Sequence, residues 1–176
     1  MAVLQLHFWP AEILRVRAEA LTPEEFTPEL VQTLEDMAET MYVEQGIGLA
    51  APQVGISKRM LVVDVPVGEE RVSNLRALIN PEIVEKEGSI VWEEGCLSFP
   101  SITAEVTRAN RIRIKYQNPL GEHCELVAEE LEAVCLQHEL DHLNGVNFVD
   151  YLSPLKRKML LRELKKHLAD EGIEAA

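Results

Sequence analysis

Apolar residues recur at helical spacing in three stretches of this chain. The first stretch follows Thr27-Pro28, a capping residue and a proline at the first helical position, and it runs to Gly46. The second begins at Glu129-Glu130 and closes at Asn144-Gly145. The third begins at Ser153-Pro154. This pattern predicts three helices, the last of which is followed by a tail that is expected to fray, residues 170–176.

Strand patterns gather in the middle of the chain. Residues 59–65 form a β-branched, apolar run typical of a buried strand. Further strand patterns follow at 75–84, 88–93, 101–107, 111–117 and 122–128. The apolar start, Met1–Pro10, has neither the cationic leader nor the cleavage site of a signal peptide, so we expect another strand there. Helices before and after a block of strands predict an α+β fold, with antiparallel or mixed β-sheets packed around the helix that follows residue 130 and with N-terminal and C-terminal helices.

The composition is that of a globular protein and excludes several classes. A length of 176 residues suits one domain over residues 1–176, and 47% apolar with 27% charged residues argues against disorder. No apolar run approaches the roughly 20 residues of a membrane helix, so no membrane partner is expected. Three cysteines, Cys96, Cys124 and Cys135, cannot all pair, which favours a reducing cytoplasm.

The charge is unevenly distributed. The net charge is −13, but residues 156–167 hold six lysines and arginines against Glu163 alone, a local charge of +5 that leaves −18 for the remainder. An acidic body will not coat nucleic acid non-specifically, so DNA is not expected as a partner. A short basic helix could still touch a polyanion locally, or its charges could simply be solvated near a helix C-terminus.

Residues 138–142 read His-Glu-Leu-Asp-His. In a helix, positions i and i+4 share one face, so His138 and His142 can hold one cation together. Glu139 falls beside such a cation and can take a proton from water. The pattern indicates metal-assisted hydrolysis, provided that a third ligand exists.

The residues alone leave the choice of the third ligand open. Cys96 lies beside a glycine between two strand patterns. Glu163 follows His142 by 21 residues, a distance like that in thermolysin-type proteases, but it lies among lysines and arginines, where a surface ion pair explains it. Two other thiols are rivals: Cys124 falls in mid-strand, and Cys135 is better interpreted as a small wall residue of the helix.

Three segments together resemble the signature motifs of the peptide deformylase family. They are Gly-Ile-Gly-Leu-Ala-Ala-Pro-Gln-Val-Gly at 46–55, Glu-Gly-Cys-Leu-Ser at 94–98 and Gln-His-Glu-Leu-Asp-His at 137–142. They occur in that family's order, and the similarity runs through nearly the whole chain, including Tyr-Leu-Ser-Pro-Leu at 151–155.

The resemblance implies removal of the formyl group from N-formylmethionine at the start of nascent polypeptides, with release of formate. It implies one divalent metal held by Cys96, His138 and His142, with Glu139 as general base and then general acid. Fe(2+) is the metal expected from the family, and Zn(2+), Ni(2+) or Co(2+) could substitute for it.

The resemblance also places two groups at the oxyanion, the side-chain amide of Gln53 and the backbone N–H of Leu97. For Gln53, a turn-capping amide is the competing interpretation. Substrate-binding residues are expected at Ile47, Gly48, Gly95, Leu131, Val134 and Cys135. The peptide beyond methionine would add as a strand, and the basic helix 156–167 could approach ribosomal RNA.

Two other functions compete with this one. A zinc endopeptidase would use Glu163 with the two histidines and cleave internal amide bonds. A non-enzymatic metal-stabilised or ribosome-binding module would have a closed four-ligand site. The uncoordinated Glu139 argues against that module, because a structural site has no use for a free carboxylate beside the metal.

Overall fold

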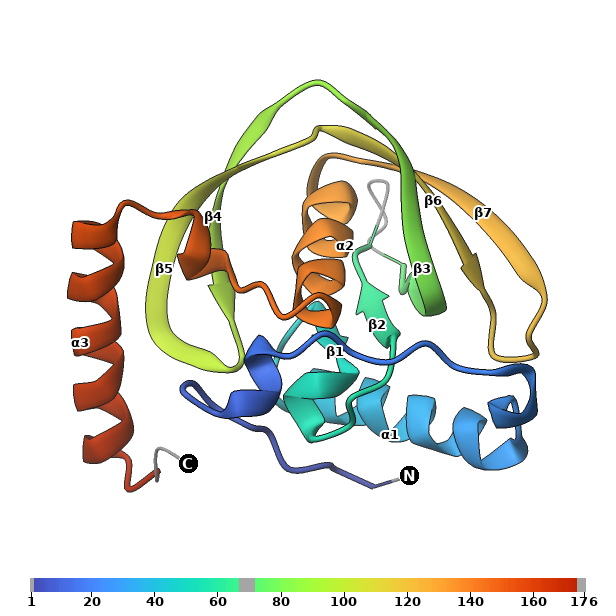
Figure 1. The fold of residues 1–176 in the computed structure, drawn as a ribbon, viewed down its shortest axis with the longest axis horizontal. Helices are drawn as coiled ribbons and strands as arrows, with labels where there is room; N and C mark the ends of the chain where they lie inside the picture. The colour runs from blue at the N-terminus through green and yellow to red at the C-terminus, as the bar shows by residue number, and fades with distance from the viewer. Residues whose placement is uncertain (1, 67–71, 174–176) are drawn as a thin grey trace.

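The computed structural model describes residues 2–66 and 72–173 of the chain (Figure 1). The α-helices found there are α1 (Pro28–Val43), α2 (Glu130–Leu143) and α3 (Pro154–Asp170). The strands are β1 (Gly48–Ala50), β2 (Met60–Asp64), β3 (Leu75–Glu87), β4 (Ile90–Cys96), β5 (Phe99–Arg108), β6 (Arg111–Gln117) and β7 (His123–Glu129). Short 3-10 helices include η3 (Ala51–Val54) and η4 (Phe148–Tyr151).

Two sheets hold these strands. One has five strands in the order β1-β2-β3-β6-β7, the other consists of β4 and β5, and every strand pair is antiparallel. The chain arches from β3 into β4 and from β5 into β6, so that the two sheets stand on either side of α2 (Figure 1). This arrangement confirms the predicted α+β fold with sheets around a central helix. The strands expected between residues 59 and 128 are present with shifted ends.

The central helix α2 is buried on most of its surface. Its apolar residues Ala133 and Leu136 are 0% exposed and pack with Leu61 and Ile114 of the five-stranded sheet. Because this packing leaves little solvent around α2, polar side chains on its remaining faces are buried too. The fold therefore places the His-Glu-Leu-Asp-His segment inside the molecule.

The outer helices begin at the predicted caps. The Thr27 side chain accepts a hydrogen bond from the N–H of Leu30 at the start of α1, and Ser153 accepts one from Lys156 at the start of α3. The α3 helix packs on β5, and only its Leu164 and Leu168 are fully buried.

The expectation of a strand over residues 1–10 is wrong for the described residues. Residues 2–8 are extended but belong to no sheet. Their N–H groups bond to partners that do not follow one strand: Leu4 donates to the side chain of Thr40, and His7 donates to the carbonyl of Gln53. Because these partners lie on separate elements, the segment does not pair with a single strand as a sheet requires. It crosses the molecule and is held by individual hydrogen bonds.

Residues 170–173 are the described part of the tail that is expected to fray, and they close α3. Gly172 adopts a left-handed conformation with φ of 71°, and the N–H of Ile173 donates to the carbonyl of Leu168. This is a helix-terminating motif in which a glycine lets the chain reverse and cap the last carbonyls. Residues 174–176 lie outside the described part.

Candidate metal centre and active site

The structure brings together three potential metal ligands from two elements. Cys96 ends β4 and is followed directly by the tight turn into β5, whereas His138 and His142 lie one turn apart on α2. The Cys96 sulfur lies 3.3 Å from His142 Nε2, which in turn lies 3.2 Å from His138 Nε2. All three ligand atoms lie within 4.8 Å of one another. Residues 42 positions apart in sequence thus converge on one point.

These separations fit a bound ion. A tetrahedral site with bonds of about 2.1 Å places its ligand atoms about 3.4 Å apart, close to the observed spacing. A thiolate with two imidazoles is also a donor set suited to Fe(2+), Zn(2+), Ni(2+) or Co(2+). The three residues therefore fit a transition-metal ion by both geometry and chemistry.

The rival ligands considered from the sequence are not part of this group. Glu163 is exposed on α3, Cys124 lies on β7, and Cys135 is buried one turn before Glu139. Within the described ranges, the group of Cys96 and the two histidines is the only one found of at least three such side chains close enough to share an ion. The arrangement required for a zinc endopeptidase, with Glu163 beside the two histidines, is absent from that part of the chain.

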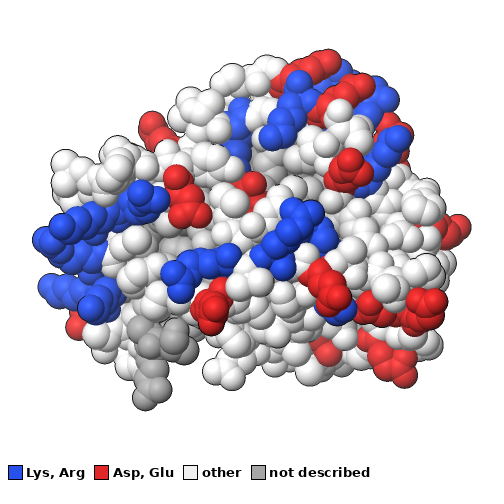
Figure 2. Space-filling model, in the orientation of Figure 1, with Lys and Arg blue, Asp and Glu red and all other residues white. Residues whose placement is uncertain are grey.

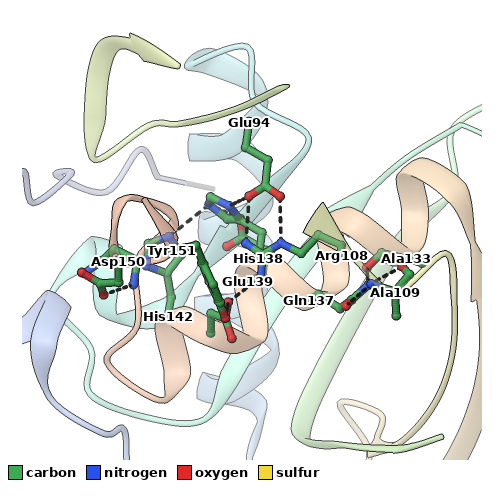
Figure 3. A network of polar contacts seen from close by, with 12 residues as sticks. Glu94, Arg108, Ala109, Ala133, Gln137, His138, Glu139, His142, Asp150 and Tyr151 are labelled. Carbon is green, nitrogen blue, oxygen red and sulfur yellow. Dashed lines mark hydrogen bonds and ion pairs between the residues drawn. The ribbon is translucent and has the colours of Figure 1, made fainter. Parts of the chain in front are cut away.

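Glu94 orients His138. Its Oε1 lies 2.8 Å from His138 Nδ1 (Figure 3). A carboxylate accepts, so Nδ1 carries the proton and donates, and the lone pair of Nε2 faces Cys96 and His142. Burial opposes ionisation of Glu94, but hydrogen bonds from Arg108 and His138 hold its pKa below the ordinary value. Glu94 therefore stays an acceptor.

Glu139 is a second buried carboxylate of the site, and only 4% of the residue is exposed. Its Oε1 lies 3.8 Å from His138 Nε2, and its Oε2 has no hydrogen-bond partner. Burial raises the pKa of Glu139 to about 7. A group that releases and accepts protons near neutrality is suited to general base and general acid catalysis.

Close packing around Glu139 explains the glycine at position 48. A β-carbon built there would lie 2.8 Å from the sulfur of Cys135 and 2.9 Å from Cγ of Glu139. Both distances are shorter than van der Waals contact allows, so only glycine lets β1 pass this close to the carboxylate.

The side chain of Gln53 is buried and serves two purposes. Its Oε1 accepts a hydrogen bond from the N–H of Ala50, so the turn-capping interpretation holds. Its Nε2 points into the centre, 3.4 Å from the Cys96 sulfur and 3.2 Å from Ser98 Oγ. The cap at one end of the amide fixes the donor at its other end.

A cavity of about 520 Å³ is lined in part by Cys96 and His138. This size suits a side chain and part of a peptide. The predicted residues found in its lining are Ile47, Gly48, Gly95, Cys96, Leu97, Leu131, Val134, Cys135, His138 and Glu139. Sequence reasoning missed the walls contributed by Trp92 and by residues 99–103. The half-exposed Trp92 on β4 offered only a weak signal, because an aromatic residue in a strand is usually core.

Sequence reasoning also missed the contacts of Glu94 and Arg108. Glu94 lies in the Glu-Gly-Cys-Leu-Ser motif at 94–98, but the motif by itself does not indicate what Glu94 does. A lone arginine at the end of a strand carries no pattern, and Arg108 could not have been found.

The fold and the site together define a class, that of metallohydrolases with a His-Glu-x-x-His helix. Comparison with known proteins narrows the class. The family described as polypeptide deformylase matches residues 3–158. A curated relative named peptide deformylase, from Desulfotalea psychrophila, is 48% identical over 166 residues, which are 94% of this chain and 97% of that protein. The chain therefore belongs to the polypeptide deformylase family.

Solved structures agree with this assignment. A crystal structure of a peptide deformylase from Legionella pneumophila is similar with a TM-score of 0.90 and 40% identity, covering 98% of this chain and 99% of that one. The peptide deformylase from Ehrlichia chaffeensis in complex with actinonin is similar with a TM-score of 0.88 and 38% identity, covering 95% and 98%. No helix in residues 2–66 or 72–173 is long and apolar enough to cross a membrane.

Proposed function

We propose that this chain is a peptide deformylase, a metallohydrolase that removes the N-formyl group from the N-terminal formylmethionine of nascent polypeptides and releases formate. The observation that carries the proposal is the convergence of Cys96, His138 and His142 beside a cavity that Cys96, His138 and the buried carboxylate of Glu139 line. Family membership supplies the substrate class. The chain acts as one catalytic domain over residues 1–176.

Cys96, His138 and His142 would hold one divalent ion. When bound, this ion lowers the pKa of its water ligand toward about 7 and polarises the formyl oxygen. We expect Fe(2+) in the cell, with Zn(2+), Ni(2+) or Co(2+) as substitutes, because a mixed thiolate and imidazole set accepts all four. Iron beside a thiolate makes the activity sensitive to oxygen.

Glu139 moves the proton of the reaction. Its unpartnered Oε2 takes a proton from the attacking water, the water oxygen bonds to the formyl carbon, and the bond from that carbon to nitrogen breaks. The same carboxyl group then delivers the proton to the departing amine. The pKa of about 7 supports both roles.

Two donors stabilise the negative oxygen that forms on the formyl carbon. They are Gln53 Nε2, held by its own cap on Ala50, and the backbone N–H of Leu97 in the turn after Cys96. Each such donor contributes about 3 kcal/mol to transition-state stabilisation in comparable sites.

The cavity receives the methionine side chain between Ile47 and the α2 residues Leu131, Val134 and Cys135. The peptide beyond it lies extended between Gly48 on β1 and Gly95 on β4. Each of these strands is at the edge of its sheet, so its unpaired backbone groups can bond to an added strand.

The enzyme works in the cytoplasm on chains that leave the ribosome. Six basic side chains lie on α3 and form a basic surface at one end of the molecule (Figure 2). This basic surface is complementary to ribosomal RNA, and the acidic remainder of the protein is not.

The test is anaerobic purification with elemental analysis, paired with a formate-release assay on formyl-Met-Ala-Ser. We expect one metal per chain and formate release. Cys96→Ser should lose or exchange the metal and lose most of its activity, because a hydroxyl is a poor replacement for a thiolate. Undiminished turnover in Cys96→Ser would overturn the proposal.

A further inference from the structure

Asp141 and Tyr151 stand in recognised sequence motifs, yet neither lines the cavity nor belongs to the ligand group. Asp141 lies three residues after His138 on α2, and Tyr151 ends η4, three residues before α3 begins. The Tyr151 hydroxyl donates to Asp141 Oδ2 over 2.7 Å. The same oxygen accepts a hydrogen bond from Arg108 Nη1 over 2.6 Å. The two motif residues therefore meet at one arginine.

Arg108 is held on every side. Its Nε and Nη2 each donate over 2.8 Å to the two oxygens of Glu94, which makes a bidentate pair (Figure 3). The Tyr151 ring covers the guanidinium, with 4.9 Å between Cζ and the ring centroid. Only 4% of the Arg108 side chain is exposed. Burial opposes its charge, but Glu94 and Asp141 raise the pKa of Arg108 above its ordinary value.

The chain of contacts ends at a candidate metal ligand. Glu94 Oε1 accepts from Arg108 Nη2 and also from His138 Nδ1, each over 2.8 Å. A planar guanidinium bonded to both carboxylate oxygens fixes the plane of that carboxylate. The plane of Glu94 in turn fixes the ring of His138, so a shift of Arg108 turns the imidazole.

We propose that Asp141 and Tyr151 are positioning residues for His138, acting through Arg108 and Glu94. The inference rests on the proposed function, since it assumes that His138 binds the metal. Both residues line a second cavity, of about 440 Å³, on a different face of α2 from the substrate cavity. Their loss should therefore loosen the metal and lower kcat without changing KM.

The experiment measures release of Co(2+) from the loaded protein to an excess of chelator. Tyr151→Phe keeps the ring over Arg108 and removes only the hydroxyl, and Asp141→Asn removes the charge from the shared acceptor. We expect release to be about 10-fold faster in Asp141→Asn and about 3-fold faster in Tyr151→Phe. Loss of a group that hydrogen-bonds directly to a metal ligand costs about 10- to 100-fold, and Asp141 and Tyr151 act further away, through Arg108 and Glu94. Tyr116→Phe, which removes a half-buried hydroxyl on β6, is the matched control and should release Co(2+) at the parent rate.

The double variant separates positioning from general stability. If Tyr151 acts through Asp141, then Tyr151→Phe adds nothing to the release rate in the Asp141→Asn background. A merely structural role would lower the thermal midpoint of the metal-free protein and leave the release rate of the folded protein unchanged.

Parental release rates in both single variants would overturn this inference alone, provided that the parent binds Co(2+) and releases formate. A parent that binds no metal would overturn the proposed function and this inference together. Parental rates of kcat with a raised KM would also overturn the inference, because they would place the effect on substrate binding.

Discussion

The helices α2 and α3 are similar in length, at 14 and 17 residues, and both carry many polar side chains. These side chains are mostly buried in α2 and mostly exposed in α3. In α2, Gln137, His138, Glu139 and His142 are all buried. In α3, the buried residues are Leu164 and Leu168, and the lysine and arginine side chains are exposed, except that Arg157 is half-buried.

The difference separates two uses of charge. Desolvation shifts protonation and makes each polar contact in α2 consequential, because an unpaired buried group is costly. The α3 charges are screened, so they act on large partners and not on chemistry. Changes in α2 should therefore alter the reaction, and changes in α3 should alter only association.

The largest effect is expected for Glu139→Gln. The amide has nearly the same shape but cannot accept the proton, so kcat should fall by about 10²- to 10⁴-fold. Formate release gives the rate, and elemental analysis of the same sample shows whether the metal is retained. Full metal content with parental kcat in Glu139→Gln would contradict the claim that the buried polar groups of α2 control the reaction.

Gly48→Ala should have the next largest effect. The new methyl group would overlap Glu139 Cγ and the Cys135 sulfur, so the carboxylate must move, and we expect kcat to fall by about 10- to 100-fold. The matched background is Cys135→Ala, which removes the contact with sulfur. If displacement of Glu139 is the cause, activity stays low in the double variant, whereas recovery there would assign the loss to the thiol.

A buried carboxylate outside both helices tests whether burial alone creates a catalytic group. Asp64, at the end of β2, accepts hydrogen bonds from the side chains of Tyr42 and Ser73 and from the N–H of Asn74. Burial works against ionisation, but these donors hold the pKa of Asp64 below its ordinary value of 3.8. We therefore expect Asp64 to contribute to the folding stability of the protein and not to catalysis.

The sign of the pH effect follows from that lowered pKa. The unfolded chain binds the proton more tightly, so this contribution to stability is present above pH 3.8 and is lost as the pH falls through the folded-state pKa. Urea unfolding between neutral and acid pH should show a shallower acid loss in Asp64→Asn than in the parent. Identical acid slopes would show that Asp64 contributes no such term.

The smallest effect on chemistry is expected on α3. Replacing Arg162, Lys165 and Lys166 by glutamine removes three exposed charges from the basic surface. The rate on formyl-Met-Ala-Ser should stay at the parental value, and co-sedimentation with ribosomes at low salt should weaken. A lowered tripeptide rate would erase the distinction between the two helices.

Most elements could be predicted from local pattern because their causes are local. Capping residues mark the starts of α1 and α3, and strand patterns mark β2 to β7 within a few residues. The apolar character of residues 1–10 also predicts a strand, but a strand needs a neighbouring strand to pair with, and that is a property of the fold.

Within the site, spacing alone predicted the histidine pair and Glu139, because positions i and i+4 of a helix share a face wherever the helix lies. The third ligand required the resemblance to a family, because the local settings of Cys96, Cys124 and Cys135 leave the choice open. Arg108 had no signal at all.

The sequence by itself determined the helices, the order of the strands along the chain and the chemical character of the His-Glu-x-x-His segment, since each depends on contacts within a few residues. The tertiary structure alone decided that Cys96 faces His142 and that Arg108 links Asp141 to Glu94. It also decided that Glu139 is buried deeply enough to raise its pKa to about 7. Distances and desolvation between distant segments depend on how the whole chain packs, and no local pattern encodes them.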